Sequence, residues 1–476
     1  MVDSANVQPG VPELQWAGKH PLRSAPYCPA RLRERYGEEA GVNRLYWGDN
    51  LEVMGDLLEE FRGRVDLVYI DPPFNSHSDY GKRVSLHGST QPGTVLHEKQ
   101  YGDVWTDDEY LQFMYERLVL LRELLADSGS LYLHCDHHKS HHLRCLMDEV
   151  FGPENFQNDI QWCYNVGGKS TSRWARKHDT ILFYSKTADF YFDGKSAGIA
   201  RETGIKSRGG IIRTDSDGRP YQDKLAKSSG KYYRYYLDEP KIPEDWWMDI
   251  NSIQSGSAER EDYPTQKPEA LLERIIRASC PEGGLVLDSF MGSGTTPAVA
   301  MKLGRRFIAA DNNVCAVHTT TKRLLRLMET PAVSQQSIPG IAILDDHPAS
   351  PGFEVWTVGT EDISRDLAVA DIAVEQGILV VHSFSPQNLL QKLSLGEELV
   401  QDWRQLVDSI MIDWTFDGTV FHPTEIDIPS KKRLVRGLYA IPDNAGTIRL
   451  KITDLLFESF KVDVTSCVVG RARREY

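Results

Sequence analysis

Residues 285–311, LVLDSFMGSGTTPAVAMKLGRRFIAAD, predict the class of fold. An apolar run is followed by a glycine-rich turn, a helical stretch that ends at Gly304, and a second apolar run that ends at Asp311. A strand, a turn, a helix and a second strand of these lengths form the repeating unit of an α/β sheet with parallel strands.

A second unit of the same kind lies nearer the start of the chain. Residues 43–61 combine a short apolar run with a helix-like stretch, and residues 65–71, VDLVYID, predict a buried strand that ends at Asp71. A helix from residue 107 and a strand over residues 131–135 follow. Together the two units predict an α/β protein with a doubly wound, mostly parallel sheet.

The segments around these units differ from them in composition. Residues 76–104 are polar and aperiodic for too long to be an ordinary connection, which predicts a functional loop. The C-terminal part has a helical stretch over residues 388–410 and partly alternating runs such as residues 446–455, which predict a small β-rich domain. Six regions are expected: an N-terminal arm (1–42), the first half of the core (43–164), an insertion (165–262), the second half of the core (263–330), a linker rich in Pro and Ser (331–352) and a C-terminal accessory domain, partly β (353–476).

The composition is that of a folded, water-soluble protein. The chain has 476 residues, of which 41% are hydrophobic and 26% are charged. No apolar stretch has the length of a secretory signal or a membrane span. The 7 cysteines include no CxxC pair, so neither a disulfide framework nor a thiolate zinc site is predicted. We expect a cytoplasmic protein without membrane contact.

The net charge of −14 would ordinarily argue against a nucleic-acid partner. The charge is distributed unevenly, however. Residues 165–236 hold 15 Lys and Arg against 7 Asp and Glu, whereas residues 331–476 hold 13 against 21. The acidic total is therefore an average, and the insertion is a basic segment suited to phosphate contacts.

Asp71, Pro72, Pro73 and Phe74 follow the first buried strand directly. Two prolines end a strand and make the turn rigid, which leaves a carboxylate and a carbonyl at the carboxyl edge of the sheet. Two acceptors beside an aromatic ring suit a planar ring that bears an amino group. A plain strand-ending turn is the alternative for this motif taken alone.

The glycine-rich turn of the second unit predicts a ligand site at the start of a helix. Gly292 and Gly294 allow the backbone to approach a ligand, and free N–H groups at a helix start favour an anionic group. Asp311 comes 17 residues after Gly294, where nucleotide-binding sheets place an acid on ribose hydroxyls. Pro297 replaces the third glycine of the dinucleotide pattern, which favours a nucleoside with a small charged tail over a pyrophosphate.

Four stretches in this order carry a resemblance to a known family: VDLVYIDPPFN, WTDDEYLQFMYERLVLLRELLADSGSLYLHCD, TQKPEALLERIIRAS and VLDSFMGSGTT. They resemble the amino-methylating DNA methyltransferases of the beta class, in which the catalytic motif precedes the cofactor motif, and especially the modification subunits of type III restriction-modification systems. The resemblance covers residues 43–325. It implies a sheet of the S-adenosylmethionine-dependent methyltransferase type, that donor, and the amino group of a flipped base in double-stranded DNA as acceptor.

The resemblance also implies roles for single residues. Asp71 and the Pro72 carbonyl would accept from the target amino group while Phe74 stacks on the base, with Pro73 completing the catalytic motif. An Asp at the first position is commoner for adenine, which favours the N6 amino group of adenine, with N4 of cytosine as the alternative. The donor site would comprise Asp49, Lys267, Asp288, Phe290, Gly292, Gly294, Thr295, Thr296 and Asp311.

Within that set, Asp311 would hold the ribose of the donor, Asp49 its adenine edge and Lys267 its methionine end. The family places target recognition in the insertion, where a run KYYRYYL over residues 231–237 could pack as strand aromatics or contact DNA. The candidate DNA contacts are Arg173, Arg176, Lys177, Lys231 and Arg234.

The resemblance places the protein in restriction-modification or phage defence. It leaves open whether the protein is a homodimer. Any restriction or translocase activity would belong to a separate subunit, because this sequence contains no P-loop. Three other functions compete with a DNA methyltransferase that modifies adenine: a cytosine enzyme on the same site, a protein or RNA methyltransferase, and a DNA-binding subunit without catalysis.

A histidine-rich run over residues 134–142 includes two pairs at helical spacing, 137 with 141 and 138 with 142. Such pairs can bind zinc, but no Glu stands at the position that zinc peptidases use. A solvated, histidine-rich helix start is far commoner. No metal is therefore expected.

Overall fold

The computed structural model describes most of the chain. The described residues are 13–37, 41–74, 78–87, 95–103, 105–165, 170–199, 211–226, 230–261, 263–329, 351–359, 368–393, 400–430 and 433–465. The predicted linker over residues 331–352 lies outside them except for its last two residues.

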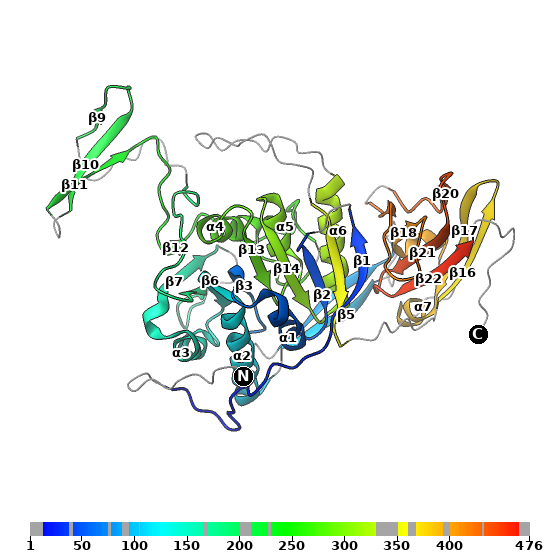
Figure 1. Ribbon diagram of the computed structural model, residues 1–476, viewed down its shortest axis with the longest axis horizontal. Helices are drawn as coiled ribbons and strands as arrows, with labels where there is room; N and C mark the ends of the chain where they lie inside the picture. The colour runs from blue at the N-terminus through cyan, green and yellow to red at the C-terminus, as the bar shows by residue number, and fades with distance from the viewer. Residues whose placement is uncertain are drawn as a thin grey trace.

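One central sheet of ten strands runs through the body of the molecule (Figure 1). Its strands, in spatial order, are β1 (Arg31–Tyr36), β15 (Phe353–Thr357), β2 (Arg44–Trp47), β14 (Arg306–Asp311), β13 (Leu285–Asp288), β3 (Val65–Ile70), β6 (Leu125–Cys135), β8 (His178–Ser185), β7 (Phe156–Cys163) and β12 (Trp246–Trp247). From β15 to β6 neighbouring strands run parallel, and antiparallel pairs join β1 at one end and β8 and β7 at the other. The predicted α/β fold with a mostly parallel, doubly wound sheet is confirmed.

Helices cover both faces of this sheet. On one face lie α1 (Asn50–Phe61), α2 (Asp107–Leu124) and α3 (Ser140–Phe151), and on the other lie α4 (Glu269–Ser279), α5 (Thr295–Lys302) and α6 (Val314–Glu329). Side chains of β3 alternate between the two cores: Val68 and Ile70 pack in the first, Leu67 and Tyr69 in the second. None of the described helices has both the length and the apolar character needed to cross a membrane.

The two sequence motifs lie on neighbouring strands at the centre of the sheet. Leu67 of β3 pairs with Val286 of β13 in a parallel register. Because both strands run the same way, Asp71 and the glycine-rich turn emerge at the same carboxyl edge. Ligands of open α/β sheets bind at such an edge.

A β-hairpin takes the place of the loop expected over residues 76–104. It consists of β4 (Ser78–Ser85) and β5 (Val95–Asp103). Near its tip, Val84 and Leu86 pack with Leu389 and Leu390 of α7 (Gln387–Leu393) in the C-terminal part of the chain. The prediction of a loop was wrong because Val84 and Leu86 are buried against a segment about 300 residues away in sequence, which local periodicity does not reveal.

The central sheet also receives one strand from the predicted arm and one from the predicted C-terminal domain. Strand β1 lies inside the region expected to be an arm, and it pairs with β15, which begins the predicted C-terminal domain. Beyond β15, two small sheets share one apolar core. They are β16 (Ala368–Glu375), β17 (Ile378–Pro386) and β20 (Leu438–Ala440), and β19 (Glu425–Asp427), β18 (Val407–Asp413), β21 (Thr447–Asp454) and β22 (Ser459–Thr465).

This C-terminal part is β-rich, as the alternating runs predict. The helix expected over residues 388–410 is shorter, because α7 ends at Leu393 and β18 begins at Val407. At the opposite end of the molecule, a three-stranded sheet of the insertion projects from the body (Figure 1). It comprises β9 (Arg213–Thr214), β10 (Pro220–Ala226) and β11 (Lys231–Tyr236).

Candidate active site

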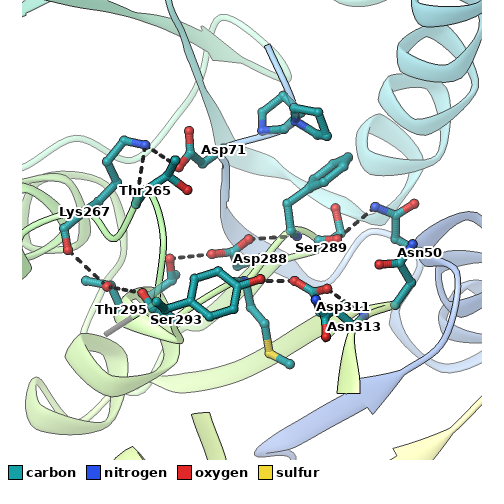
Figure 2. A pocket seen from close by; sticks show the side chains of 18 of the residues that line it. Asn50, Asp71, Thr265, Lys267, Asp288, Ser289, Ser293, Thr295, Asp311 and Asn313 are labelled. Atoms are coloured by element: carbon teal, nitrogen blue, oxygen red, sulfur yellow. Dashed lines mark hydrogen bonds and ion pairs between the residues drawn. The ribbon is translucent and has the colours of Figure 1, made fainter. Parts of the chain in front are cut away.

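A cavity of about 380 Å³ opens at the carboxyl edge of the sheet, where β3 and β13 meet (Figure 2). Both sequence motifs line it. Of the residues predicted for catalysis and donor binding, those that line the cavity are Asp49, Asp71, Pro72, Pro73, Phe74, Lys267, Asp288, Phe290, Gly292, Thr295, Thr296 and Asp311. The fold therefore gathers residues from three regions of the chain into one site.

The carboxylate of Asp71 is held on one side only. Lys267 Nζ lies 2.5 Å from its Oδ2 atom. The other oxygen, Oδ1, is buried and has no hydrogen-bond partner among the described residues. A buried acceptor without a partner costs free energy, so this oxygen is poised to accept from a ligand. Lys267, which the resemblance places at the methionine end of the donor, contacts the catalytic motif here.

Phe74 stands beside this ion pair at the rim of the motif. The Lys267 ammonium lies 5.4 Å from the centre of its ring, within the range of a cation–π contact. The two prolines before Phe74 restrict the backbone, so the ring is displayed next to the Asp71 carboxylate rather than on a freely moving segment.

The glycine-rich turn wraps around the end of β14. Gly292 and Gly294 have positive φ values of 48° and 72°, and the Gly292 N–H donates to Asp311 Oδ2 over 3.0 Å. A Cβ atom on Gly294 would lie 2.4 Å from Thr320 Oγ1. Gly294 does not line the cavity, and its role in the structure is to let the turn pack against α6.

Two carboxyl groups at the ends of β13 and β14 line the cavity: Asp288 is buried and Asp311 is partly buried. Burial raises the pKa of Asp288 to about 7 and that of Asp311 to about 6. Hydrogen bonds from Thr296 Oγ1 and the Phe290 N–H oppose the rise at Asp288. Both groups would gain from a cation placed nearby, since a positive charge favours the ionised form.

The hydroxyl groups of Thr295 and Thr296 hold the turn rather than facing open space. Thr296 Oγ1 donates to Asp288 Oδ2 over 2.5 Å, and Thr295 Oγ1 donates to the Lys267 carbonyl over 3.1 Å. Arg323 of α6 donates in turn to Thr295 Oγ1. These threonines therefore connect the donor half of the site to the segment that carries Lys267.

Asp49 caps α1 and closes the opposite wall. Its Oδ1 atom accepts from the Leu51 N–H over 2.8 Å and from Arg117 Nη2 over 3.1 Å. The neighbouring Asn50 donates from Nδ2 to the Ser289 carbonyl over 2.9 Å, which ties this wall to β13.

Several lining residues were missed by the sequence prediction. Trp105 and Phe113 pack together with ring centres 4.7 Å apart, and Phe113 meets Phe290 edge to face. Tyr263 and Asn313 also line the cavity. Phe113 lies on a helix where an apolar residue predicts only core packing, so no signal in the sequence distinguished it.

The predicted DNA contacts lie outside the cavity, on two separate elements. Arg173, Arg176 and Lys177 belong to the segment between β7 and β8, where the two arginines are exposed. Because β8 begins beside the end of β6, this segment leaves the sheet at the same edge as Asp71. Lys231 and Arg234 lie on β11 of the projecting sheet, where Arg234 pairs with Asp223 over 3.1 Å.

The histidine-rich run does not form the helical pairs that its spacing suggests. His137 and His138 precede α3, which begins at Ser140. Asp136, His137 and His138 offer ligand atoms that all lie within 4.8 Å of one another, with both histidines exposed.

A family model described as DNA methylase, which unites N6 and N4 methyltransferases, matches residues 65–322, more than half of the chain. The chain belongs to this family. Its methyl donor is accordingly S-adenosyl-L-methionine, and the reaction is the methylation of DNA.

Curated relatives include the type II methyltransferase M.EcaI of Enterobacter cloacae, 28% identical over 62% of this chain and 72% of its own length. The StyLTI Mod subunit of Salmonella typhimurium is 25% identical over 70% of this chain and 63% of that subunit. The DNA adenine methyltransferase YhdJ of Escherichia coli is 28% identical over 61% of this chain and 84% of its own length.

Among solved structures, the PvuII cytosine-N4-specific DNA methyltransferase matches with 20% identity and a TM-score of 0.38, over 62% of this chain and 90% of its own. The M1.HpyAVI–SAM complex matches with 18% identity and a TM-score of 0.36, over 59% and 98%.

The cavity fits S-adenosylmethionine, which supplies a methyl group bound to a positively charged sulfur. Its volume suits a nucleoside-sized ligand. The aromatic pair of Phe113 and Phe290 offers an apolar wall for a purine, and the carboxyls of Asp288 and Asp311 offer negative charge and acceptors.

Proposed function

We propose that the protein methylates the N6 amino group of adenine in double-stranded DNA, acting on a base flipped out of the helix. The observation that carries this proposal is the buried, unpartnered Oδ1 atom of Asp71 beside Phe74 at the mouth of the donor cavity. An exocyclic amino group has two hydrogens to donate, and this site offers an unoccupied acceptor next to an aromatic face.

In this proposal Asp71 Oδ1 and the Pro72 carbonyl accept the two amino hydrogens, while Phe74 stacks on the extruded ring. These contacts aim the nitrogen lone pair toward the methyl carbon. The nitrogen forms the new N–C bond, the electrons of the S–C bond return to sulfur, and the nitrogen then loses a proton. Flipping costs a few kcal/mol, of which stacking on one aromatic ring returns about 1–3 kcal/mol.

Lys267 orients the Asp71 carboxylate. Its ammonium binds Oδ2 and so leaves Oδ1 turned toward the incoming amino group. Asp71 therefore acts by positioning the amino group, whose nitrogen attacks with its own lone pair and loses a proton afterwards.

The choice of adenine rests on the Asp at the first position of the motif and on relatives such as YhdJ, which is named a DNA adenine methyltransferase. The test is to methylate DNA, digest it to nucleosides and identify the product by mass spectrometry. N6-methyladenine is expected. N4-methylcytosine as the only product would show that the alternative within the family is right.

Asp71→Ala tests the catalytic assignment. Methylation should fall by at least about a hundredfold, because one positioned acceptor is lost, while donor binding measured by calorimetry changes little. The control is Asp127→Ala, which removes an exposed carboxylate at the far end of β6. Undiminished methylation in the Asp71 variant would remove this residue from the mechanism.

We infer that DNA lies across the carboxyl edge of the sheet, contacted by the segment that carries Arg173, Arg176 and Lys177. Trp174 in the same segment is 95% exposed, which is costly for so large an apolar side chain unless a partner covers it. The projecting β9–β10–β11 sheet supplies a second contact through Lys231 and Arg234 and through exposed tyrosines such as Tyr232.

The StyLTI Mod subunit, one of the relatives, belongs to a type III restriction-modification enzyme. We propose that this protein likewise acts with a separate restriction subunit. Light scattering of the protein alone and with DNA distinguishes a monomer from a homodimer.

A further inference from the structure

His134 is the one member of the histidine-rich run that lies inside the core. It sits on β6, next to β3, and its side chain is fully buried. Both ring nitrogens have partners. Nδ1 lies 3.0 Å from the hydroxyl of Tyr69, and Nε2 lies 3.1 Å from Asp179 Oδ2.

The partners of His134 hold its ring in one orientation. Burial alone would raise the pKa of Asp179. Hydrogen bonds from His134 and Tyr164 and the positive charge of Lys267 lower this pKa below its usual value. An ionised carboxylate only accepts, so Nε2 carries the proton and donates to Asp179. The Tyr69 hydroxyl completes the set at Nδ1, and Tyr164 donates to the second oxygen of Asp179 over 3.0 Å.

The ring of His134 lies behind Phe74. The two rings are nearly parallel, with planes 21° apart and centres separated by 6.2 Å. Tyr69 and Trp162 meet the imidazole edge to face, with interplanar angles of 86° and 80°. Tyr69 also lines the cavity, on β3 two residues before Asp71, which directly follows this strand.

We propose that His134 is a positioning residue for methyl transfer: its locked ring is the back wall against which Phe74 stacks, so that Phe74 presents its other face to the target base at a fixed place. This inference rests on the proposed function, in which Phe74 stacks on the base. His134 itself touches neither base nor donor. Without this wall, Phe74 would occupy several orientations and the amino group would be aligned only part of the time.

Three substitutions separate the parts of this arrangement. His134→Leu removes both hydrogen bonds and the flat ring. His134→Gln keeps a donor near the place of Nε2 for Asp179, and His134→Asn keeps an acceptor near the place of Nδ1 for Tyr69. The matched control is His141→Gln, which changes an exposed histidine of α3 outside the site.

The readouts are kcat, the KM for the donor, and the fluorescence of 2-aminopurine placed at the target position of the DNA. We expect His134→Leu to lower kcat by about tenfold to a hundredfold, the cost of a misplacement near 1 Å, with the donor KM unchanged. The flipped 2-aminopurine should become brighter, because it stacks less on Phe74. Gln and Asn should each restore part of kcat and part of the quenching.

Phe74→Ala, measured in parallel, distinguishes an error in the proposed base stacking on Phe74 from an error in the role of His134. If Phe74→Ala leaves kcat and fluorescence unchanged, base stacking in the proposed function is wrong. If Phe74→Ala has its effect but His134→Leu and His134→Gln behave like His141→Gln, only the role of His134 is wrong. Loss of donor binding in step with kcat in the Gln variant, which retains the bond to Asp179, would show a merely structural role and overturn the inference.

Discussion

Two acidic side chains at the end of the central strands have pKa values that make donor binding depend on pH. Desolvation raises the pKa of Asp288 to about 7 and that of Asp311 to about 6. A cation in the cavity favours their ionised forms, so binding a positively charged donor should release protons.

We therefore expect the donor Kd to fall as pH rises from 5 to 8, and Asp288→Asn to remove the upper part of this dependence. Calorimetry in two buffers of different ionisation enthalpy counts the protons released. A Kd that is constant over this range would contradict the assignment of these carboxyls to the donor site.

The same raised pKa values bear on stability. A carboxyl whose pKa is higher in the folded state stabilises the fold fully below its unfolded pKa near 4 and loses that contribution as pH rises to the folded pKa. Asp288→Asn should thus gain stability relative to the wild type between pH 5 and pH 8. Thermal unfolding without donor, followed at both pH values, tests this sign.

Gly294 provides a second prediction at the scale of one residue. Gly294→Ala must accept a left-handed backbone, at about 1–2 kcal/mol, and also a contact of 2.4 Å with Thr320. Gly304→Ala is the matched control, because Gly304 also has a positive φ, of 66°, but no atom within 4 Å of the added Cβ.

The difference in unfolding free energy between these two variants isolates the contact with α6. We expect the Gly294 variant to be the less stable of the two and to bind the donor more weakly, whereas the Gly304 variant keeps its donor affinity. Equal losses of stability would mean that the turn moves aside without cost.

At the scale of elements, we expect the segment between β7 and β8 to contribute more to DNA affinity than the projecting sheet. Arg173 and Arg176 lie at the edge that carries Asp71, whereas Arg234 already pairs with Asp223 and covers the ring of Tyr221. Neutralising the first pair should therefore weaken binding more than neutralising Lys231 and Arg234.

If both arginines contact phosphate, Arg173→Gln with Arg176→Gln should reduce the slope of log K against log salt by about 2. Fluorescence anisotropy with labelled DNA at several salt concentrations measures the slope. Trp174→Ala should weaken DNA binding but leave this slope unchanged, because an indole stacks and carries no charge. An unchanged slope in the arginine variant would place the DNA elsewhere.

At the scale of the whole molecule, the β4–β5 hairpin connects the active site to the C-terminal part. Phe74 precedes the hairpin, Asp103 ends its second strand and Trp105 follows it, and all three line the cavity. At the other end of the hairpin, Val84 and Leu86 pack with α7. Leu86→Asp, at a side chain that is 3% exposed, should release this tip and lower kcat by about tenfold through poorer alignment.

The matched control for the hairpin is Val369→Asp, on an exposed position of β16. Steady-state kinetics and donor calorimetry together report the result. Wild-type kcat in the Leu86 variant would show that the C-terminal contact does not affect the site.

A buried ion pair joins β1 to the C-terminal sheets. Lys451 Nζ lies 2.5 Å from Glu34 Oε1, and both side chains are buried. Burial alone would raise the pKa of Glu34, but the charges of Lys451 and Lys461 lower it to about 2. The pair contributes stability above the unfolded pKa near 4.5, and this contribution is lost as pH falls toward 2.

Lys451→Met leaves the Glu34 carboxylate unpaired and should cost about 3–5 kcal/mol of unfolding free energy at pH 7. Adding Glu34→Gln should recover much of this loss, because no buried charge then remains. Urea unfolding of both variants tests the pair, and equal stability of the single and double variants would contradict this account.

The sequence by itself determined the α/β fold, the two motifs and the family they resemble. These features are local, because apolar runs, prolines and glycines next to a strand act on the backbone within a few residues. Residues such as Asp71, Asp288 and Gly292 could therefore be predicted to line a site, and the structure gathers them around one cavity.

Only the tertiary structure decided what touches these residues. The bond of Lys267 to Asp71, the contact of Phe113 with Phe290, and the buried His134 behind Phe74 all join segments far apart in the chain. Such contacts depend on strand order and on which face a side chain occupies, and neither follows from periodicity. The hairpin that replaced the expected loop has the same cause, because Val84 and Leu86 are buried against the C-terminal part of the chain.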